Sequence, residues 1–333
     1  NTINDPIILN NFMFEWVRSE DQNLGKTGAA KLVGNSVYYI NQDDEYILSQ
    51  LSLTKENMID VEGIKAVFDF KDQTLVYVAY MKDNCATAKL VSLENNETLL
   101  QLECVPRQNA NLSPFGGAVL ILNESEFLLS TGTPTNEHTT DEISQTAQDD
   151  KSYWGKILKF TFDTETPEIS IFSKGHRNSQ DIAKVNGKIY AVEHGPRGGD
   201  EINEIIEGMN YGWPLQSFGS EYDVSIISKA YDSIDNHQLP LYTFMPSIGI
   251  SSIDECPKNY ASYYEPFNCL AVSSMRGGAI FFVVFDGAKV FFTERLDFGS
   301  RIRKFFVSDN KIVAVTDFEG VIVGQLDRIP MLR

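Results

Sequence analysis

The chain has 333 residues, 42% of them hydrophobic, and a formal net charge of −18 at pH 7. This charge argues against nucleic acid or an anionic membrane surface as a general partner, because both repel acidic proteins. No apolar run approaches the length of a membrane span, so we expect a soluble protein. The first residue is Asn1 and not methionine, which indicates a processed product or a fragment.

One pattern repeats along the chain: a β-rich run, a polar turn and a second β-rich run. Clear copies lie at 30–40, 66–79, 118–130, 182–192 and 304–315, and a blurred one at 250–274. Each is followed by a candidate third strand, at 46–51, 88–93, 155–162, 200–206, 278–284 and 320–326. Outer strands are predicted at 98–102, 168–172 and 289–293.

Short strands in groups of four, at a period of roughly 40 to 50 residues, are typical of propeller blades. Six copies predict an all-β fold: a six-bladed β-propeller with four-stranded antiparallel blades, forming a single domain over residues 1–333. The last copy lacks an outer strand, and the N-terminal run 12–17 could supply it and close the ring. An all-β sandwich would not require six similar units.

Two segments interrupt the repeat. Residues 133–151 are polar and acidic and are predicted to form an exposed loop. Residues 215–247 contain few candidate strands and several aromatic residues. Long loops on a rigid scaffold commonly shape its binding site, so we expect both loops near the mouth of a central site.

The four cysteines form two local pairs, Cys85/Cys104 and Cys256/Cys269, without a zinc-type spacing. We favour two short-range disulfides in an exported protein over four free thiols. Three Asn-x-Ser/Thr sequons begin at Asn96, Asn111 and Asn123. Such short motifs are weak signals and matter only in a glycosylating host.

The segment 172–214 concentrates the residues suited to chemistry. His176-Arg177-Asn178 places an imidazole, a guanidinium and an amide side by side. The run 195–199 (Gly-Pro-Arg-Gly-Gly) allows a bend in which backbone groups face a ligand. Asp200 and Glu201 then supply hard oxygen atoms of the kind that calcium prefers. Alone, each motif would more often be structural or surface charge.

Together, three motifs resemble the soluble aldose (glucose/sorbosone) dehydrogenase family: Gly-His-Arg-Asn at 175–178, Glu-His-Gly-Pro-Arg-Gly-Gly-Asp-Glu-Ile-Asn at 193–203, and Asn-Tyr-Gly-Trp-Pro at 210–214. Weaker similarity extends over most of the chain, including 115–117, 154–158, 245–248, 274–278, 301–303 and 315–320. Members of that family are six-bladed propellers that use pyrroloquinoline quinone (PQQ) and calcium.

The resemblance implies roles for individual residues. The backbone carbonyls of Gly195 and Pro196 would hold a catalytic calcium, and Glu201 with the backbone of Tyr211 would hold a second, structural one. The cofactor's carboxylates and oxygens would be met by Arg177, Asn178, Arg276, Arg301 and Arg303. Arg276 stands where the family usually has lysine, which keeps the charge but changes the contact geometry.

One expected residue is missing. The family's base is a histidine that takes the hydroxyl proton as hydride leaves the anomeric carbon. That position holds Pro114, which has no titratable group. A glutamine expected nearby is replaced by Val61, and neither His138 nor His194 has the spacing of a substitute.

Three functions therefore stay open. The first is PQQ- and calcium-dependent oxidation of an aldose sugar to its lactone with a soluble electron acceptor, in the periplasm or secreted, with turnover reduced by Pro114. The second, nearly as well supported, is a non-catalytic binding propeller that retains the pocket. A calcium-dependent hydrolase on the same architecture explains the motifs less well.

Overall fold

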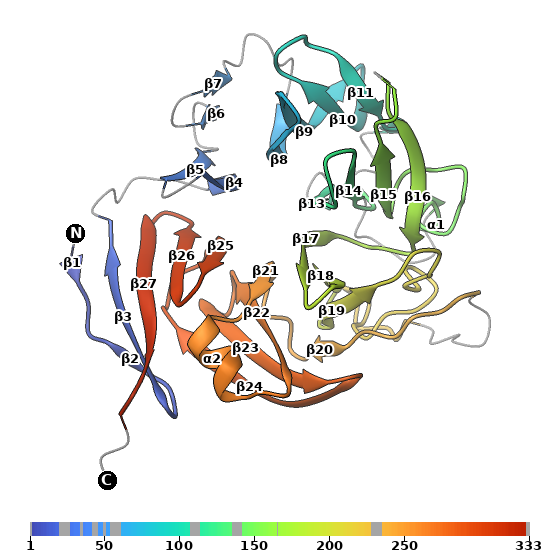
Figure 1. Cartoon of the computed structure of the whole chain (residues 1–333). Helices are drawn as coiled ribbons and strands as arrows, with labels where there is room; N and C mark the ends of the chain where they lie inside the picture. The colour runs from blue at the N-terminus through green and yellow to red at the C-terminus, as the bar shows by residue number, and fades with distance from the viewer. Residues whose placement is uncertain are drawn as a thin grey trace.

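The structure is a computed structural model that describes residues 2–19, 27–33, 36–41, 46–48, 51–53, 61–106, 114–134, 142–164, 166–227 and 235–330. The fold is all-β, as predicted (Figure 1). Its described helices are two short ones, α1 (Glu142–Gln145) and α2 (Lys258–Tyr263). In the described part of the chain no helix has the length and hydrophobicity of a membrane span.

Four antiparallel sheets of at least four strands make up the middle of the chain. The first contains β8 (Val61–Phe70), β9 (Gln73–Lys82), β10 (Cys85–Ser92) and β11 (Thr98–Gln101), and β12 (Val105–Pro106) also pairs with β10. The second contains β13 (Gly116–Ile121), β14 (Glu126–Thr131), β15 (Lys156–Thr161) and β16 (Glu168–Lys174). The third contains β17 (Ser179–Val185), β18 (Lys188–Glu193), β19 (Asp200–Ile205) and β20 (Tyr242–Phe244). The fourth contains β21 (Ile250–Glu255), β22 (Asn268–Ser274), β23 (Ala279–Asp286) and β24 (Lys289–Asp297).

The remaining strands come from both ends of the chain. Two two-stranded sheets precede the four large ones: β4 (Thr27–Val33) with β5 (Ser36–Asn41), and β6 (Tyr46–Leu48) with β7 (Leu51–Leu53). A six-stranded sheet combines β25 (Ile302–Ser308), β26 (Lys311–Thr316) and β27 (Val321–Arg328) with β3 (Phe12–Arg18), β1 (Thr2–Ile3) and β2 (Ile7–Ile8). Strand β3 pairs with β27 from Ile322↔Arg18 to Arg328↔Phe12, so the predicted N-terminal run does lie beside the last strand.

The sheets are arranged around a common centre with their first strands innermost (Figure 1). Neighbouring first strands contact one another in the order β4, β8, β13, β17, β21 and β25, and β25 in turn contacts β4. Apolar side chains fill the layers between adjacent sheets. Phe127, for example, stacks on Phe160 and meets Phe68 and Phe70 of the neighbouring sheet edge-on.

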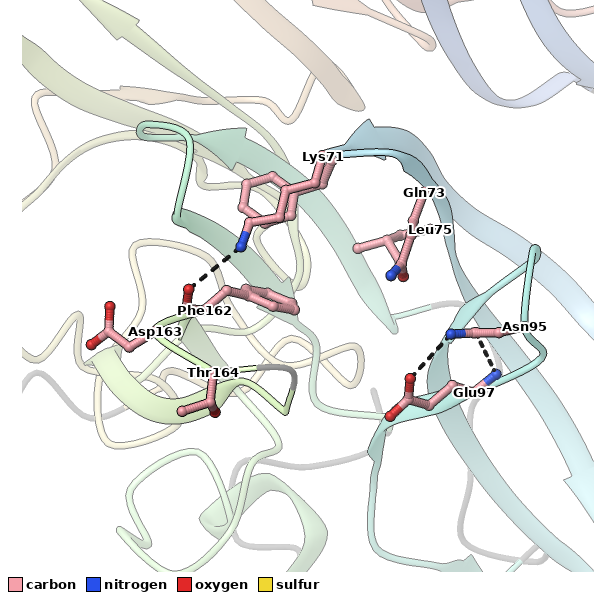
Figure 2. Close-up of a pocket in the computed structure, with 9 residues that line it drawn as sticks. Lys71, Gln73, Leu75, Asn95, Glu97, Phe162, Asp163 and Thr164 are labelled. Carbon is pink, nitrogen blue, oxygen red and sulfur yellow. Dashed lines mark hydrogen bonds between the residues drawn. The ribbon is translucent and has the colours of Figure 1, made fainter.

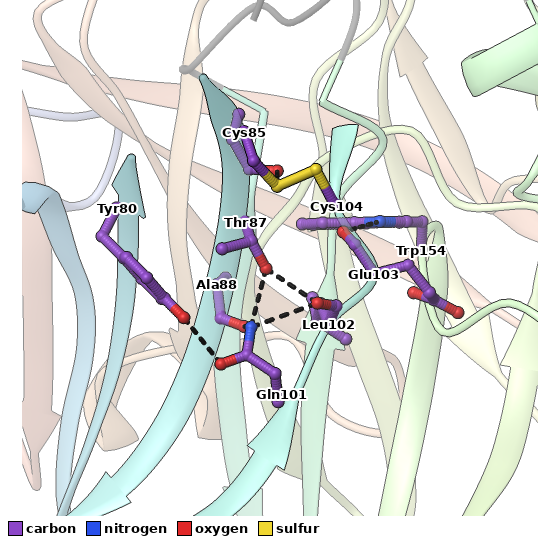
Figure 3. The surroundings of a disulfide bond; sticks show 10 residues. Tyr80, Cys85, Thr87, Ala88, Gln101, Leu102, Glu103, Cys104 and Trp154 are labelled. Carbon is purple, nitrogen blue, oxygen red and sulfur yellow. Dashed lines mark hydrogen bonds between the residues drawn. A yellow bond between two sulfur atoms is a disulfide. The ribbon is translucent and has the colours of Figure 1, made fainter. Parts of the chain in front are cut away.

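Both predicted cysteine pairs form disulfides, Cys85–Cys104 and Cys256–Cys269. Figure 3 shows the first, which ties β10 to the segment after β11. Beside it, the amide of Gln101 donates to Thr87 Oγ1 at 2.8 Å and accepts from the Tyr80 hydroxyl at 2.6 Å. The disulfide therefore fixes a sheet edge that polar side chains also hold.

The blurred fifth repeat has a structural explanation. Where other copies have a short polar turn, the segment between β21 and β22 contains helix α2 and the Cys256–Cys269 bridge. Tyr260 of α2 is fully buried and packs against Phe12 and Phe282. The repeat is thus preserved in its strands and interrupted only in its connection.

Strand register separates two ends of the sheets. Gly116 pairs with Thr131, Ser179 with Glu193, Ile250 with Ser274 and Ile302 with Thr316, which puts these residues at one end. The hairpin turns after Phe70, Ile121, Val185 and Ser308 lie at the other. The motif residues predicted from sequence lie at the first end, which we call the motif end.

Candidate active site

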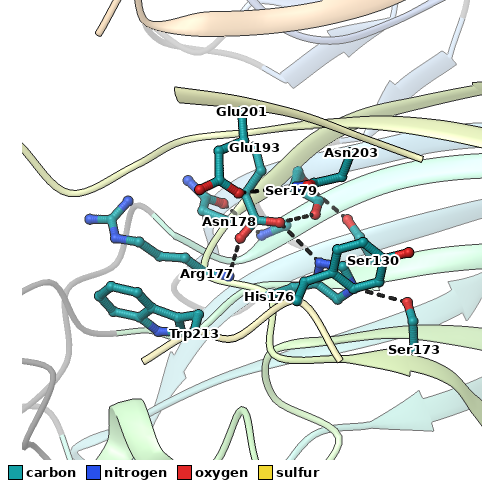
Figure 4. A network of polar contacts seen from close by, with 12 residues as sticks. Ser130, Ser173, His176, Arg177, Asn178, Ser179, Glu193, Glu201, Asn203 and Trp213 are labelled. Carbon is teal, nitrogen blue, oxygen red and sulfur yellow. Dashed lines mark hydrogen bonds and ion pairs between the residues drawn. The ribbon is translucent and has the colours of Figure 1, made fainter. Parts of the chain in front are cut away.

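A buried carboxylate, Glu193 at the end of β18, organises the His-Arg-Asn motif (Figure 4). It accepts hydrogen bonds from His176 Nδ1 at 3.0 Å, the Ser179 hydroxyl at 3.0 Å and the backbone N–H of Arg177. Burial opposes its charge, but these bonds lower the pKa of Glu193 below its ordinary value. His176 Nε2 is bonded to Ser173 Oγ at 2.8 Å, so both ring nitrogens are engaged and His176 has a structural role.

Arg177 is buried, and its guanidinium lies over the ring of Trp213 at 5.3 Å from the centroid (Figure 4). Its Nη1 donates to the backbone carbonyl of His194 at 3.2 Å, and its Nη2 to the Tyr222 hydroxyl at 3.4 Å. Sequence reasoning selected Arg177 but missed Trp213 and Tyr222 as its supports. The Asn-Tyr-Gly-Trp-Pro motif already contained Trp213, without indicating what the indole would contact.

Arg301, just before β25, and Arg303, within β25, both bind one buried carboxylate. Asp317 accepts from Arg301 Nε at 3.2 Å and from Arg303 Nη2 at 2.9 Å, and its side chain is only 1% exposed. Arg301 is about half exposed. Asp317 follows β26 in a segment that matched the family, but sequence alone did not reveal it as the partner of both arginines.

The remaining predicted cofactor residues border this cluster. His194 is half-buried, and burial together with the charges of Arg177 and Arg303 lowers its pKa against the opposing charge of Asp200. Asn178 Nδ2 lies 3.5 Å from His194 Nδ1. Arg276 is exposed and follows Met275, whose sulfur contacts Arg301 Nη2 at 3.7 Å.

The glycine-rich turn between β18 and β19 is fastened by Asp200. Its Oδ1 accepts from Gly195 N at 3.1 Å, and its Oδ2 accepts from Ile248 N and Ile250 N at 3.0 Å each. The turn is tight, because a Cβ on Gly195 would lie 2.2 Å from the carbonyl oxygen of Gly198. Asp200 thus holds the loop through both of its carboxylate oxygens.

Glu201 is half-buried and lies close to two other carboxylates, Glu193 and Asp200. Burial and the charges of Glu193 and Asp200 raise its pKa to about 8, although Asn203 Nδ2 donates to it at 3.2 Å. Asn203 Oδ1 is buried and accepts no hydrogen bond within the described part of the chain. Tyr211 stacks on His176 at 4.7 Å and donates its hydroxyl to Glu204 O at 2.6 Å.

Lys156 stabilises the loop that packs against the Gly-His-Arg-Asn motif. Lys156 is fully buried, and its ammonium donates to the carbonyls of Thr146, Ala147 and Trp154 at 2.8, 3.1 and 2.7 Å. Burial lowers its pKa to about 7. The carbonyl of Ala147 also accepts from Gly175 N at 3.0 Å, so the loop that Lys156 holds docks directly on the motif.

The segment expected to carry the base also lies here. Gly116 N donates to Asn178 Oδ1 at 3.2 Å, so Pro114 is two residues from a contact with the predicted cofactor residues. Pro114 is buried. His138 and the side chain of Val61 lie outside the described part of the structure.

The family model for glucose/sorbosone dehydrogenases matches residues 54–323, which is most of the chain. The chain belongs to this family. The match includes the motif end of four large sheets and all predicted site residues. It therefore confirms the resemblance that the three motifs indicated.

Curated relatives are similar over part of their length. An uncharacterised protein of Synechocystis is 36% identical over 42% of this chain and 38% of its own length. Quinoprotein glucose dehydrogenase B of Acinetobacter calcoaceticus is 38% identical over 23% of this chain and 18% of its own. Aldose sugar dehydrogenase YliI of Escherichia coli is 34% identical over 32% and 33%. The aligned segments thus span well under half of these relatives.

Solved structures support the fold over nearly the whole chain. The soluble aldose sugar dehydrogenase of Escherichia coli superposes with a TM-score of 0.71 at 19% identity, covering 95% of this chain and 100% of that one. The PQQ-bound aldose sugar dehydrogenase of Streptomyces coelicolor gives 0.68 at 16% identity, covering 96% and 99%. At this identity the similarity concerns the fold alone.

The donor set fits the family's cofactor. PQQ carries three carboxylates, and the motif end presents four arginines, of which Arg177, Arg301 and Arg303 are oriented by described partners. Among the described residues, no group of three or more His, Cys, Asp or Glu side chains is arranged around a metal. A calcium site would therefore have to draw on backbone carbonyls, as the Gly195–Pro196 turn could supply.

Proposed function

We propose that the chain oxidises an aldose sugar to its lactone with PQQ and calcium and passes the electrons to a soluble acceptor. The observation that carries the proposal is the position of Arg177, Arg301 and Arg303 at the motif end, each oriented by a described partner. Bound PQQ would accept hydride from the anomeric carbon while the hydroxyl proton leaves to a base.

The chain's own residues would bind and orient. Arg177, Arg276, Arg301 and Arg303 would neutralise the cofactor's carboxylates, and Asn178 would hydrogen-bond to its oxygens. Asp317 would keep two of the arginines at a fixed spacing, since it accepts from both. The Trp213 ring would hold Arg177 flat beside the site.

For the metals, the carbonyls of Gly195 and Pro196 would hold one calcium, and Glu201 with the backbone of Tyr211 a second. The second assignment is supported by the position of Glu201, where burial and the neighbouring charges of Glu193 and Asp200 raise its pKa to about 8. A divalent cation would offset that repulsion, and the free Asn203 Oδ1 offers another oxygen nearby.

Pro114 favours a second function, a binding propeller without turnover. A general base typically contributes about 10²- to 10⁴-fold to a rate, so a proline in its place predicts slow turnover or none. Among the described histidines, His176 has both nitrogens engaged. The pocket could then serve to retain PQQ or calcium.

We also infer a six-bladed propeller that forms one domain over residues 1–333, closed by the N-terminal strand. The cyclic contacts of β4, β8, β13, β17, β21 and β25 support six units. The pairing of β3 with β27 supports closure. Two disulfides support a periplasmic or secreted location.

The deciding experiment titrates the purified protein with PQQ and calcium, follows the cofactor's absorbance, and then adds aldoses with a redox dye. Binding with dye reduction supports the dehydrogenase, and binding without it supports the second function. Absence of binding contradicts both. Substituting Pro114→His is expected to raise dye reduction by about 100-fold, the lower end of the range for a general base.

The second calcium has a separate test. A chelator should lower the melting temperature of the wild type more than that of Glu201→Gln, because the variant keeps the first calcium site but lacks the charge that draws the second cation. The exposed Glu207→Gln serves as the control and should respond like the wild type. Equal responses of all three proteins would contradict the role of Glu201.

A further inference from the structure

A sequon lies at the end of the sheets away from the motif end. Asn96-Glu97-Thr98 forms the tip and exit of the hairpin between β10 and β11. Asn96 is exposed and has a φ of +56°, a left-handed conformation typical of a turn tip. This position is independent of the candidate active site.

We propose that Asn96 is an acceptor for N-linked glycosylation. In that reaction Asn96 Nδ2 forms a bond to the anomeric carbon of an oligosaccharide, and the bond from that carbon to a lipid-linked diphosphate breaks. The amide loses one proton and the diphosphate carrier leaves. The co-substrate is thus a lipid-diphosphate-linked oligosaccharide, and a transferase of the export pathway catalyses the reaction. The two disulfides also indicate passage through an export pathway.

The hairpin leaves the acceptor groups available. Neither the Asn96 carboxamide nor the Thr98 hydroxyl makes a side-chain hydrogen bond to the described part of the chain, and Thr98 is also exposed. The neighbours on either side of Asn96 are fixed instead. Asn95 Oδ1 accepts from Glu97 N at 3.0 Å, and Asn95 Nδ2 donates to Glu97 Oε2 at 3.2 Å.

The surroundings leave room for a sugar. Asn95 and Glu97 line one side of a pocket of about 610 Å³, and Lys71, Phe162 and Asp163 line the other (Figure 2). The pocket opens between two neighbouring sheets, at their hairpin ends. The first sugar on Asn96 would therefore lie at the rim of a polar depression, without displacing a packed side chain.

A second described sequon, Asn123-Glu124-Ser125, is an internal contrast. Asn123 Oδ1 accepts from both the backbone N–H and the hydroxyl of Ser125, at 2.8 and 3.1 Å. Asn123 Nδ2 donates to Glu126 Oε2 at 2.8 Å. Both the acceptor amide and the sequon hydroxyl are thus engaged, so Asn123 should be occupied less than Asn96. The third sequon, at Asn111, lies outside the described residues.

The test expresses the full chain through the secretory pathway of a host that attaches N-glycans. Peptide mapping after enzymatic glycan release in heavy-oxygen water should show Asn96 converted to labelled aspartate in most molecules. Asn96→Gln and Thr98→Ala should each remove one glycan mass. Asn95→Gln, which changes the adjacent asparagine outside any sequon, should not.

Two results would overturn the proposal: an unmodified Asn96 in protein with both disulfides formed, or occupancy at Asn123 equal to or above that at Asn96. A PQQ titration of Asn96→Gln distinguishes failure of the glycosylation proposal from failure of the proposed function. Because β8 is 10 residues long, the hairpin lies roughly 30 Å from the motif end, so this variant should bind PQQ like the wild type.

Discussion

Asp317 is the residue on which the arginine pair depends. Its side chain is almost fully buried, yet both of its charged partners are partly exposed, Arg301 by 48% and Arg303 by 25%. A buried carboxylate requires such partners, because its own desolvation is costly. The pairing also keeps two like charges close together before any anionic ligand arrives.

Replacing Asp317 by asparagine should therefore have two effects. The free energy of unfolding should fall by about 1–3 kcal/mol, since the three hydrogen bonds from Arg301 and Arg303 lose their charged acceptor and solvent screens part of the loss. Affinity for PQQ should fall as the two guanidinium groups separate. Urea unfolding and absorbance titration measure these effects.

The exposed Asp286 provides the matched control, because Asp286→Asn makes the same chemical change on the surface. It should change the unfolding free energy by less than about 0.5 kcal/mol. An Asp317→Asn variant that behaved like this control would contradict the organising role of Asp317.

Sequence reasoning selected the cationic residues of the candidate site but not the residues that support them. Arg177, Arg301 and Arg303 were selected because the family motifs fix their positions. Asp317 and Trp213 were not selected as partners, since contacts between distant segments of a chain leave no local pattern. Glu193 was likewise visible only as one letter of a motif, although three groups converge on it.

At the level of elements, the turn between β18 and β19 is limited by space. Gly195→Ala would put a Cβ 2.2 Å from Gly198 O and 2.4 Å from Gly199 O, both backbone atoms that cannot rotate away. We expect a loss of about 2–4 kcal/mol in unfolding free energy and weaker binding of calcium and PQQ. Thermal unfolding and calcium titration test this expectation.

Gly187→Ala separates crowding from backbone strain. Gly187 has a φ of +81°, but a Cβ added there would have no heavy atom within 4 Å, so only strain should appear, at about 1 kcal/mol. If the two alanine variants lost equal stability, crowding at Gly195 would not be the cause.

The loop held by Lys156 should respond to pH. Burial lowers the pKa of Lys156 to about 7, whereas an unfolded lysine titrates near its ordinary value of 10.5. Between these values the unfolded chain binds more protons than the folded one, so the contribution to stability rises with pH from about 7 to 10. Below about pH 7 both states bind the proton, and the contribution stays at its lowest value.

Lys156→Met should remove this rise of stability with pH. The variant should also lose about 2–4 kcal/mol of unfolding free energy, because three buried carbonyls no longer have a donor. Lys151→Met, an exposed change in the same loop, should retain the wild-type pH profile. Urea unfolding at several pH values measures both. A profile for Lys156→Met parallel to that of the wild type would contradict the assignment.

The strands of the repeat were more predictable than their connections. Alternating apolar residues located the strands, because each sheet face packs against a neighbouring sheet. Helix α2 and the loop before β20 followed no such period, and their conformation depends on contacts such as that of Tyr260 with Phe12. The fifth repeat was blurred for this reason.

At the scale of the molecule, the first and last strands stabilise each other. Phe14 of β3 is fully buried, and its ring fills the space that a side chain on Gly324 would need. Phe14→Ala should cost about 3–5 kcal/mol, the usual range for a buried phenylalanine. Ile8→Ala, on a side chain that is 60% exposed, should cost less than about 1 kcal/mol.

Urea unfolding of both variants tests this coupling. Hydrogen exchange adds a local measure, because amides of β27 bonded to β3 should exchange faster in Phe14→Ala than amides of β22. Uniform acceleration through both strands would indicate global destabilisation without a specific link between the chain's two end segments.

The pairing of β3 with β27 has a consequence for biosynthesis. Ser19 Oγ accepts from Val321 N, a contact 302 positions apart in the chain. At synthesis rates of about 5–20 residues per second, roughly 15–60 s separate the appearance of these two partners. During that interval Phe12 and Phe14 have no sheet to cover them. The early strand therefore exposes apolar side chains that a chaperone on the nascent chain could bind until β27 appears.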